Sequence, residues 1–260
     1  MRARLRTTFE EIPDAYDRAR PTYPAAIFDD LLALARIPRG GRIVEIGCGT
    51  GLATLPLAER GYRITCIELG EQLAEFARRR LAPFPTVEVV NADFEIWEPR
   101  DGSFDAAVAF TAFHWLDPEL RYERSASVLR PGGALAVVAT QHVLPQGGDP
   151  FFAEVQADYD AIVPSDDNRP PPDPAAVFDL ADEIAASGRF HDAAGRRYLW
   201  DVTYTADEYI AVLDTYSGHR TIVREKRERL YERIHRRIEA HPTGHLRKTY
   251  LATLNVAERR

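Results

Sequence analysis

One run of the sequence combines glycines with an acidic residue in a pattern that suits ligand binding. Residues 43–51 are IVEIGCGTG, so that Gly47, Gly49 and Gly51 alternate after Glu45. The run follows a β-type segment and opens a helix-type segment, where glycines permit a tight turn and let a ligand approach the backbone. A purely structural turn is the alternative, but three alternating glycines after a carboxylate favour a binding site.

Two further acids stand at the ends of neighbouring predicted strands. Glu68 ends the second strand, where a carboxylate can accept both hydroxyls of a ribose. Asp93 follows the third strand and can accept from an adenine amino group, with Phe94 or Ala92 against the ring. The alternatives are a solvated strand end for Glu68 and an Asx turn or helix cap for Asp93.

Residues that could act on a second ligand follow the fourth predicted strand, in the run 111–115. His114 is the first candidate for a general base, because a histidine pKa near ~6.5 allows proton uptake at neutral pH. A histidine bonded to backbone is the alternative. Trp115 could line a ligand pocket or pack under the next helix.

Other candidate substrate-binding residues come from later parts of the chain. His142 lies just past the fifth predicted strand, and Tyr216, His219 and Arg220 lie between two predicted helices. A turn that only connects the helices is the alternative for the last three.

Strand-like and helix-like segments alternate through the first half of the chain. This alternation predicts a doubly wound α/β fold with a parallel sheet, whose ligand lies beyond the carboxyl ends of the strands. The predicted strands are 42–46, 63–68, 87–91, 104–110 and 134–140. The predicted helices are 23–35, 52–60, 71–81 and 118–129, and residues 130–133 (RPGG) are a predicted turn.

The amino-acid composition changes after residue 140. Residues 141–174 are rich in Pro, Asp and Gly, which predicts a loop or lid rather than a further sheet layer. A strand at 197–204, helices at 206–216 and 221–240, and a closing strand within 244–255 follow.

Composition limits the classes of protein and partner. A chain of 260 residues fits one domain with an elaboration, and a net charge of −7 disfavours nucleic acid and anionic membranes. Cys48 and Cys66 have no zinc-site spacing, so we expect no metal, no disulfide framework and a cytoplasmic location. We also expect no secretory signal and no membrane span.

The ordered motifs resemble those of the class I S-adenosylmethionine-dependent methyltransferases. The resemblance covers residues 39–140 and rests on Glu45-x-Gly47-x-Gly49-x-Gly51, Glu68, Asp93, the pair at 104–105 and RPGG at 130–133. It implies a Rossmann-like sheet of seven strands, mostly parallel, with an antiparallel strand near the C-terminus. It also implies that the glycine turn binds the methionyl part of S-adenosylmethionine, Glu68 the ribose and Asp93 the adenine. Leu69, Phe94 and Thr111 are expected to contact the cofactor too.

A narrower similarity points to small-molecule methyltransferases that include trans-aconitate methyltransferase. It rests on residues 16–24 (YDRARPTYP), 113–116 (FHWL) and 204–220. It implies that the N-terminal segment folds over the cofactor, with Tyr16 or Arg20 at the cofactor carboxylate. Packing aromatics are the alternative for Tyr16 and Tyr23.

Together these patterns predict one methyltransferase domain over residues 1–260. Its expected parts are a helical flap (1–38), a cofactor-binding core (39–140), a helical lid insertion (141–186) and a C-terminal closure of the sheet (187–260). The expected reaction is methyl transfer to O, S, N or C of a small molecule, and the oligomeric state stays open. The alternatives are a repurposed S-adenosylmethionine-binding protein and an NAD(P)-dependent oxidoreductase, which Leu52 in place of a glycine disfavours.

Overall fold

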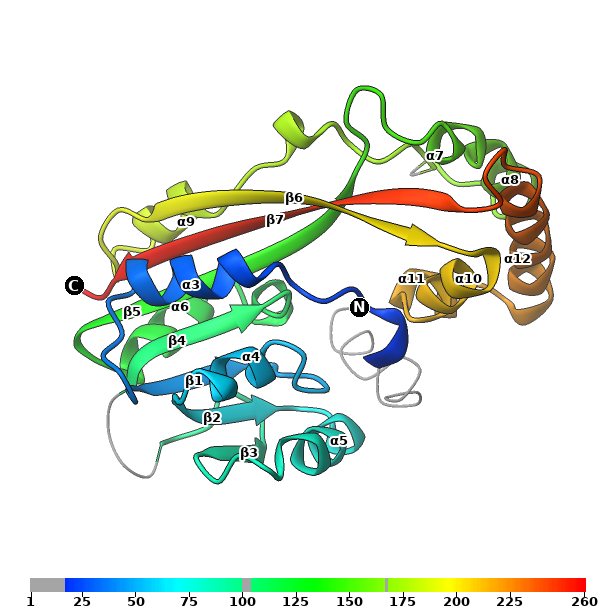
Figure 1. Ribbon diagram of the computed structural model, residues 1–260. Coiled ribbons are helices and arrows are strands. Elements are labelled where there is room, and N and C mark those ends of the chain that lie inside the picture. Colours follow the sequence, from blue (N-terminus) through cyan, green and yellow to red (C-terminus); the bar gives the residue numbers. More distant parts are fainter. Residues whose placement is uncertain (1–16, 100–103, 167) are drawn as a thin grey trace.

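A single mixed sheet organises the molecule. The computed structural model describes residues 17–99, 104–166 and 168–260, and within them seven strands pair in the order β3-β2-β1-β4-β5-β7-β6 (Figure 1). Only β7 among them runs antiparallel to its neighbours, which confirms the predicted topology. The strands are β1 (Arg42–Ile46), β2 (Arg63–Glu68), β3 (Val87–Asn91), β4 (Phe104–Phe110), β5 (Leu129–Val143), β6 (Ala194–Tyr204) and β7 (Leu246–Glu258).

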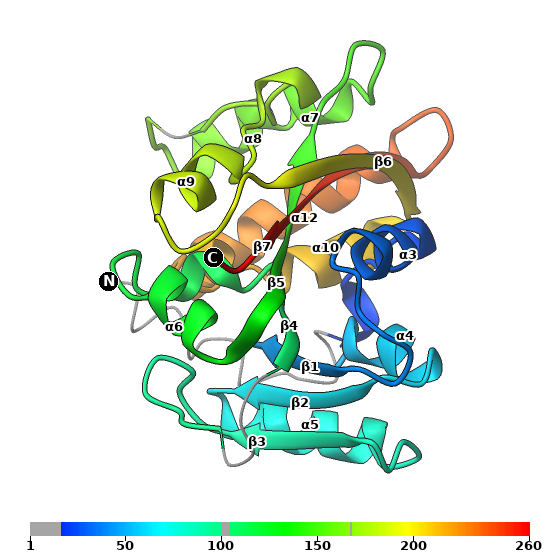
Figure 2. The ribbon, with the colours of Figure 1, turned by 90° about the vertical axis from the view of Figure 1, so that its left-hand side faces the viewer.

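Helices cover both faces of this sheet. Alternate residues of a strand face opposite sides, so that Ile43 belongs to one core and Val44 to the other. The first face packs against α3 (Ala25–Leu34), α4 (Thr54–Glu59) and α5 (Glu71–Leu81). The second packs against η1 (Phe113–Trp115), α6 (Arg121–Ser127) and α9 (Ala181–Ala186), and Figure 2 shows the two sides separated by the sheet.

The strand β5 differs from its prediction. We expected a turn at 130–133 and a strand at 134–140, but the strand spans Leu129–Val143 and contains that run. Gly132 has φ +71°, and the pairing with β4 shifts between Phe104 and Ala106. The glycines therefore make a bulge inside the strand. Pairing with β7 from Ala134 to Val143 then carries β5 past the predicted end.

Five helices form a cap at the far ends of β6 and β7 (Figure 1). They are α7 (Phe151–Glu154), α8 (Gln156–Ile162), α10 (Ala206–Asp214), α11 (Ser217–Arg220) and α12 (Arg224–Glu239). We call them the helical cap; a third core of side chains such as Phe151, Tyr209 and Ile234 holds it together. The segment 141–186 thus divides: it supplies α7 and α8 to the cap, whereas α9 packs on the sheet.

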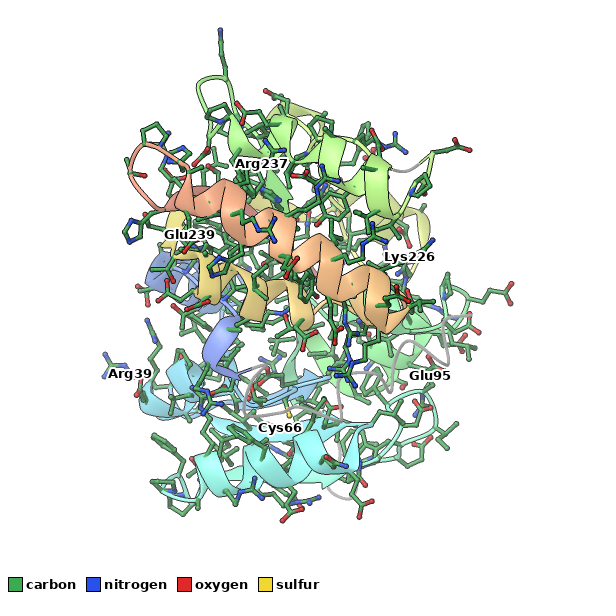
Figure 3. The ribbon with its side chains drawn as sticks, turned by 90° about the vertical axis from the view of Figure 1, so that its right-hand side faces the viewer. Arg39, Cys66, Glu95, Lys226, Arg237 and Glu239 are labelled. Atoms are coloured by element: carbon green, nitrogen blue, oxygen red, sulfur yellow. The ribbon has the colours of Figure 1, made fainter. Side chains whose placement is uncertain are left out.

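The helix α12 closes the outer side of the cap. It packs against α10 and α8, and its charged residues Lys226 and Glu239, labelled in Figure 3, are exposed. Arg237 and Arg233 bind Asp158 of α8 at 2.7 and 3.0 Å, which joins the two helices. Across the described residues, no helix combines the length and apolar character needed to cross a membrane.

Candidate active site

The glycine turn lies at the carboxyl end of β1. Gly47 and Gly49 have φ of +67° and +57°, a backbone conformation that glycine adopts without strain. A Cβ on Gly47 would come within 2.8 Å of the Ala112 side chain, whereas a Cβ on Gly49 would meet no atom within 4 Å. Gly47 therefore lets two segments approach closely, and Gly49 leaves space for a ligand beside the turn.

Glu68 at the end of β2 bonds to this turn. Its Oε2 accepts the Gly49 N–H at 2.8 Å, and its Oε1 accepts the Gly70 N–H at 2.9 Å. Glu68 is buried, and a carboxylate oxygen can accept more than one hydrogen bond. The sequence placed this carboxylate at the end of a strand; its hydrogen bond to the turn was not foreseen.

Glu45 is buried in β1 beneath the glycine turn. Its Oε2 accepts from the Thr54 hydroxyl at 2.7 Å. Burial, with a smaller contribution from Glu68, raises the pKa of Glu45 to about 8 despite the Thr54 bond, which acts in the opposite direction. The carboxyl is therefore protonated at neutral pH in the ligand-free protein.

A cavity of about 410 Å³ opens beside the turn, and we call it the glycine-turn cavity. Glu45, Glu68, Leu69, Phe94 and Thr111 all line it, as do the three successive residues Gly47, Cys48 and Gly49. The structure thus brings together most of the predicted cofactor-binding residues.

Four predicted residues are placed differently. Gly51 continues the turn, donating its N–H to the Cys48 carbonyl, but does not line the cavity. Asp93 also stands outside the lining, and its Oδ1 accepts from the Glu95 N–H at 3.0 Å in an Asx turn. His114 and Trp115, expected on the acceptor side, line the glycine-turn cavity, with ring centroids 4.7 Å apart.

The described part of the N-terminal segment covers this cavity. Arg20 and Tyr23 line it, and an ion pair between Asp17 and Arg80 joins the segment to α5. Arg20 donates to the Thr215 carbonyl at 3.1 Å, and its guanidinium lies 4.6 Å from the centre of the Tyr216 ring. Tyr16 lies outside the described residues.

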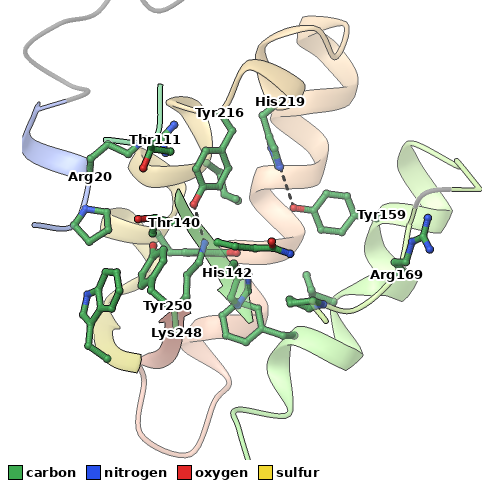
Figure 4. A pocket seen from close by; sticks show the side chains of 18 of the residues that line it. Arg20, Thr111, Thr140, His142, Tyr159, Arg169, Tyr216, His219, Lys248 and Tyr250 are labelled. Atoms are coloured by element: carbon green, nitrogen blue, oxygen red, sulfur yellow. Dashed lines mark hydrogen bonds between the residues drawn. The ribbon is translucent and has the colours of Figure 1, made fainter. Parts of the chain in front are cut away.

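A second cavity, of about 570 Å³, lies between the sheet and the helical cap, and we call it the lysine cavity (Figure 4). Three predicted substrate-binding residues, His142, Tyr216 and His219, line it. Residues that the sequence analysis did not single out line it as well, among them Thr140, Tyr159, Arg169, Lys248 and Tyr250. The described lining contains Arg20, Arg169 and Lys248 but no Asp or Glu, so its wall is positively charged.

Lys248 of β7 is 1% exposed at this wall. Its Nζ donates to the Tyr216 hydroxyl at 2.8 Å, and among the described residues no carboxylate lies within ion-pair distance of it. Burial lowers the pKa of Lys248. One feature of the sequence could have indicated Lys248 as a site residue. Lys226 and Lys248 are the only lysines among the 33 Lys and Arg residues, and Lys248 falls in a predicted strand.

The histidines of the lysine cavity are neutral. Burial and the charge of Lys248 lower the pKa of His142 to about 2 and that of His219 to about 4. His219 Nε2 bonds to the Tyr159 hydroxyl at 3.1 Å, while His142 Nε2 and Thr140 Oγ1 are buried without a hydrogen-bond partner within the described structure. Unpaired buried polar atoms on a cavity wall suit a polar ligand.

The two cavities share one wall. Arg20, Tyr23, Leu52, Thr111 and Tyr216 line both. Thr111 has φ +54°, a strained conformation for a β-branched residue, and its hydroxyl lies 3.0 Å from that of Tyr23. Ligands in the two cavities can therefore meet at Thr111 and Tyr216. In the part of the chain that the structure describes, no group of three His, Cys, Asp or Glu could hold a metal ion.

Comparisons with known proteins agree with this architecture. Residues 43–133 match the family model described as a methyltransferase domain. An uncharacterized methyltransferase of Mycobacterium tuberculosis is 35% identical over 131 residues, which is 50% of this chain and 51% of that protein. A trans-aconitate 2-methyltransferase of Paracidovorax citrulli is 34% identical over 125 residues, 46% of this chain and 45% of that protein. The chain thus spans about half the length of the curated relatives it matches.

A solved structure matches nearly the whole chain. It is described as a candidate type II methyltransferase of Anaeromyxobacter dehalogenans, with a TM-score of 0.60 and 25% identity, covering 92% of this chain and 97% of that one. The family model, the relatives and the sheet order agree: residues 43–133 are similar to methyltransferase domains, and the fold is that of the class I S-adenosylmethionine-dependent methyltransferases.

Proposed function

We propose that the protein transfers the methyl group of S-adenosylmethionine to a small molecule held in the lysine cavity. The observation that carries this proposal is the wall shared by the two cavities at Thr111 and Tyr216. Volumes of about 410 and 570 Å³ fall in the range of small-molecule sites. A cofactor in one cavity and an acceptor in the other would be held with their reacting atoms adjacent, which is the main requirement of a methyl transfer.

The residues of the glycine-turn cavity fit this cofactor. Gly49 leaves open space beside the turn, Glu68 offers acceptor oxygens to a ribose, and Leu69 and Phe94 offer apolar surface to an adenine. Arg20 suits the cofactor carboxylate. When bound, the sulfonium of the cofactor makes its methyl group electrophilic. The protein's own part is to orient the two ligands and exclude water.

The lysine cavity favours an acceptor with oxygen atoms. Lys248, Arg20 and Arg169 place positive charge on its wall, and His142 and Thr140 add unpaired polar atoms. Such a wall stabilises negative charge on an oxygen. The cavity volume of about 570 Å³ favours a small molecule over a polymer.

Calorimetry followed by a transfer assay tests the proposal. S-adenosylmethionine should bind, NAD should not, and tritium should pass from labelled cofactor to members of a panel of phenols, enols, acids and thiols. Binding of NAD alone would refute the assignment. Tight cofactor binding with no transfer to any member would instead indicate a repurposed cofactor-binding protein.

A further inference from the structure

A tyrosine occupies the position where the two ligands would meet. Tyr216 lies between α10 and α11, as the N-cap of α11, and it lines both the glycine-turn cavity and the lysine cavity. Its hydroxyl accepts a hydrogen bond from Lys248 Nζ at 2.8 Å, as Figure 4 shows.

We propose that Tyr216 is the catalytic base of the transfer, and that the acceptor carries a hydroxyl group such as that of a phenol or an enol. The inference rests on the proposed function, because it assigns the proton acceptor of that same reaction. Tyr216 would touch the hydroxyl to be methylated, and Lys248 would hold the Tyr216 oxygen in place and stabilise its negative charge.

The surroundings of Tyr216 favour the phenolate. The Lys248 ammonium lies 5.0 Å from the centre of the Tyr216 ring, and the Arg20 guanidinium lies 4.6 Å from it. Burial alone would raise the pKa of Tyr216, but Lys248 and Arg20 outweigh burial and leave that pKa below its ordinary value of 10. Tyr216 in turn favours the charged ammonium of Lys248, because its charge and hydrogen bond oppose the lowering of the pKa of Lys248 by burial.

The neighbouring titratable groups do not compete for this role. The titratable and charged groups near Tyr216 include Arg20 of the N-terminal segment, Lys248 and Tyr250 of β7, Tyr204 of β6, Tyr209 of α10, His219 of α11 and Tyr159 of α8. Burial raises the pKa of each of the four other tyrosines, so these remain protonated. His142 and His219, with pKa values lowered to about 2 and 4, are weak bases.

The step balances in atoms and charge. The acceptor O–H proton passes to the Tyr216 oxygen, and the electron pair of that bond forms the new bond from oxygen to the methyl carbon. The bond from carbon to sulfur breaks with its electrons left on sulfur. One negative charge, on the phenolate, and one positive charge, on the sulfonium, are both neutralised, which a cavity of low dielectric favours. Tyr216 returns its proton to solvent after the products leave.

The decisive measurement needs no acceptor. Phenolate absorbance in the ligand-free protein, followed from about pH 6 to about pH 10, should include one tyrosine that ionises below the ordinary range. Tyr216→Phe should remove that transition, and Lys248→Met should move it to higher pH. The matched control is Tyr198→Phe, because Tyr198 donates to Asp30 outside both cavities, and it should leave the transition unchanged. Superimposable curves for the wild type and Tyr216→Phe would overturn the proposal.

Transfer kinetics provide the second readout. With a hydroxyl acceptor from the panel, Tyr216→Phe, which keeps the aromatic ring, should lower kcat by roughly 10²–10⁴-fold. An unchanged kcat would also overturn the proposal. Failure of the proposed function would appear separately, as absent binding of S-adenosylmethionine in calorimetry. Circular dichroism of each variant checks that the fold is retained.

Discussion

The backbone N–H of Gly49 donates to Oε2 of Glu68 over 2.8 Å, so that the turn after β1 and the end of β2 form one hydrogen-bonded unit. The second carboxylate oxygen accepts from Gly70. Glu68 therefore fixes the backbone on which a cofactor would rest, in addition to offering lone pairs to it.

Replacing Glu68 with Gln should weaken binding of S-adenosylmethionine by roughly 10–100-fold. An amide has one acceptor oxygen, so its NH₂ group would face one of the two backbone N–H donors, and a lost charge-assisted bond costs about 1.5–3 kcal/mol. Calorimetry measures the change. Glu88→Gln, on the exposed side of β3, is the control and should bind as the wild type does. Equal affinities for all three proteins would contradict this role.

Gly47→Ala should destabilise the fold and weaken cofactor binding, whereas Gly40→Ala should only destabilise it slightly. Both glycines have φ near +70°, so an alanine at either position costs about 1 kcal/mol of backbone strain. Only at Gly47 would the new Cβ lie 2.8 Å from the Ala112 side chain, which adds roughly 1–3 kcal/mol of overpacking. Urea unfolding of both variants measures the difference. Matched losses would show that the close approach at Gly47 is unimportant.

Glu45 should make the ligand-free protein less stable as the pH rises. Its folded pKa is raised to about 8 from 4.5, so its contribution is complete below pH 4.5 and is lost as the pH rises toward 8. Over that interval the unfolded chain has released a proton that the folded chain keeps, which lowers the free energy of unfolding by roughly 1.4 kcal/mol per pH unit.

Urea midpoints at a series of pH values test this dependence. Glu45→Gln keeps a side-chain oxygen for the Thr54 hydroxyl and cannot ionise, so its stability should fall less steeply than that of the wild type between about pH 5 and about pH 8. Glu59→Gln, at the exposed end of α4, should follow the wild type. Parallel slopes for wild type and Glu45→Gln would mean that the buried carboxyl does not titrate in this range.

The sheet was largely predictable because local patterns specify it. The bounds of β1 to β4 match their predictions to the residue, since each strand is a short apolar run ended by a turn. The turn predicted for RPGG at 130–133 was wrong for a physical reason. Its residues favour a turn locally, but pairing of β5 with β4 before the run and with β7 after it absorbs the glycines as a bulge.

The glycine-turn cavity was predictable and the lysine cavity was not. Gly47 and Gly49 follow the first predicted strand and Glu68 ends the second, so the parallel pairing of β1 and β2 brings them together. Lys248 meets Tyr216 only because β7 inserts between β5 and β6 and the cap folds over its end. Such long-range contacts leave no local pattern in a single sequence.

The wall shared by the two cavities links the affinities of their ligands. Both ligands would contact the five residues of this wall, which are Arg20, Tyr23, Leu52, Thr111 and Tyr216. A ligand that orders these side chains from one cavity would lower the entropic cost of binding in the other. Thermodynamic linkage makes the effect reciprocal: if the acceptor tightens cofactor binding by some factor, the cofactor tightens acceptor binding by the same factor. A product in either cavity would contact the same wall, so its release would be coupled to the ligand that remains in the other cavity.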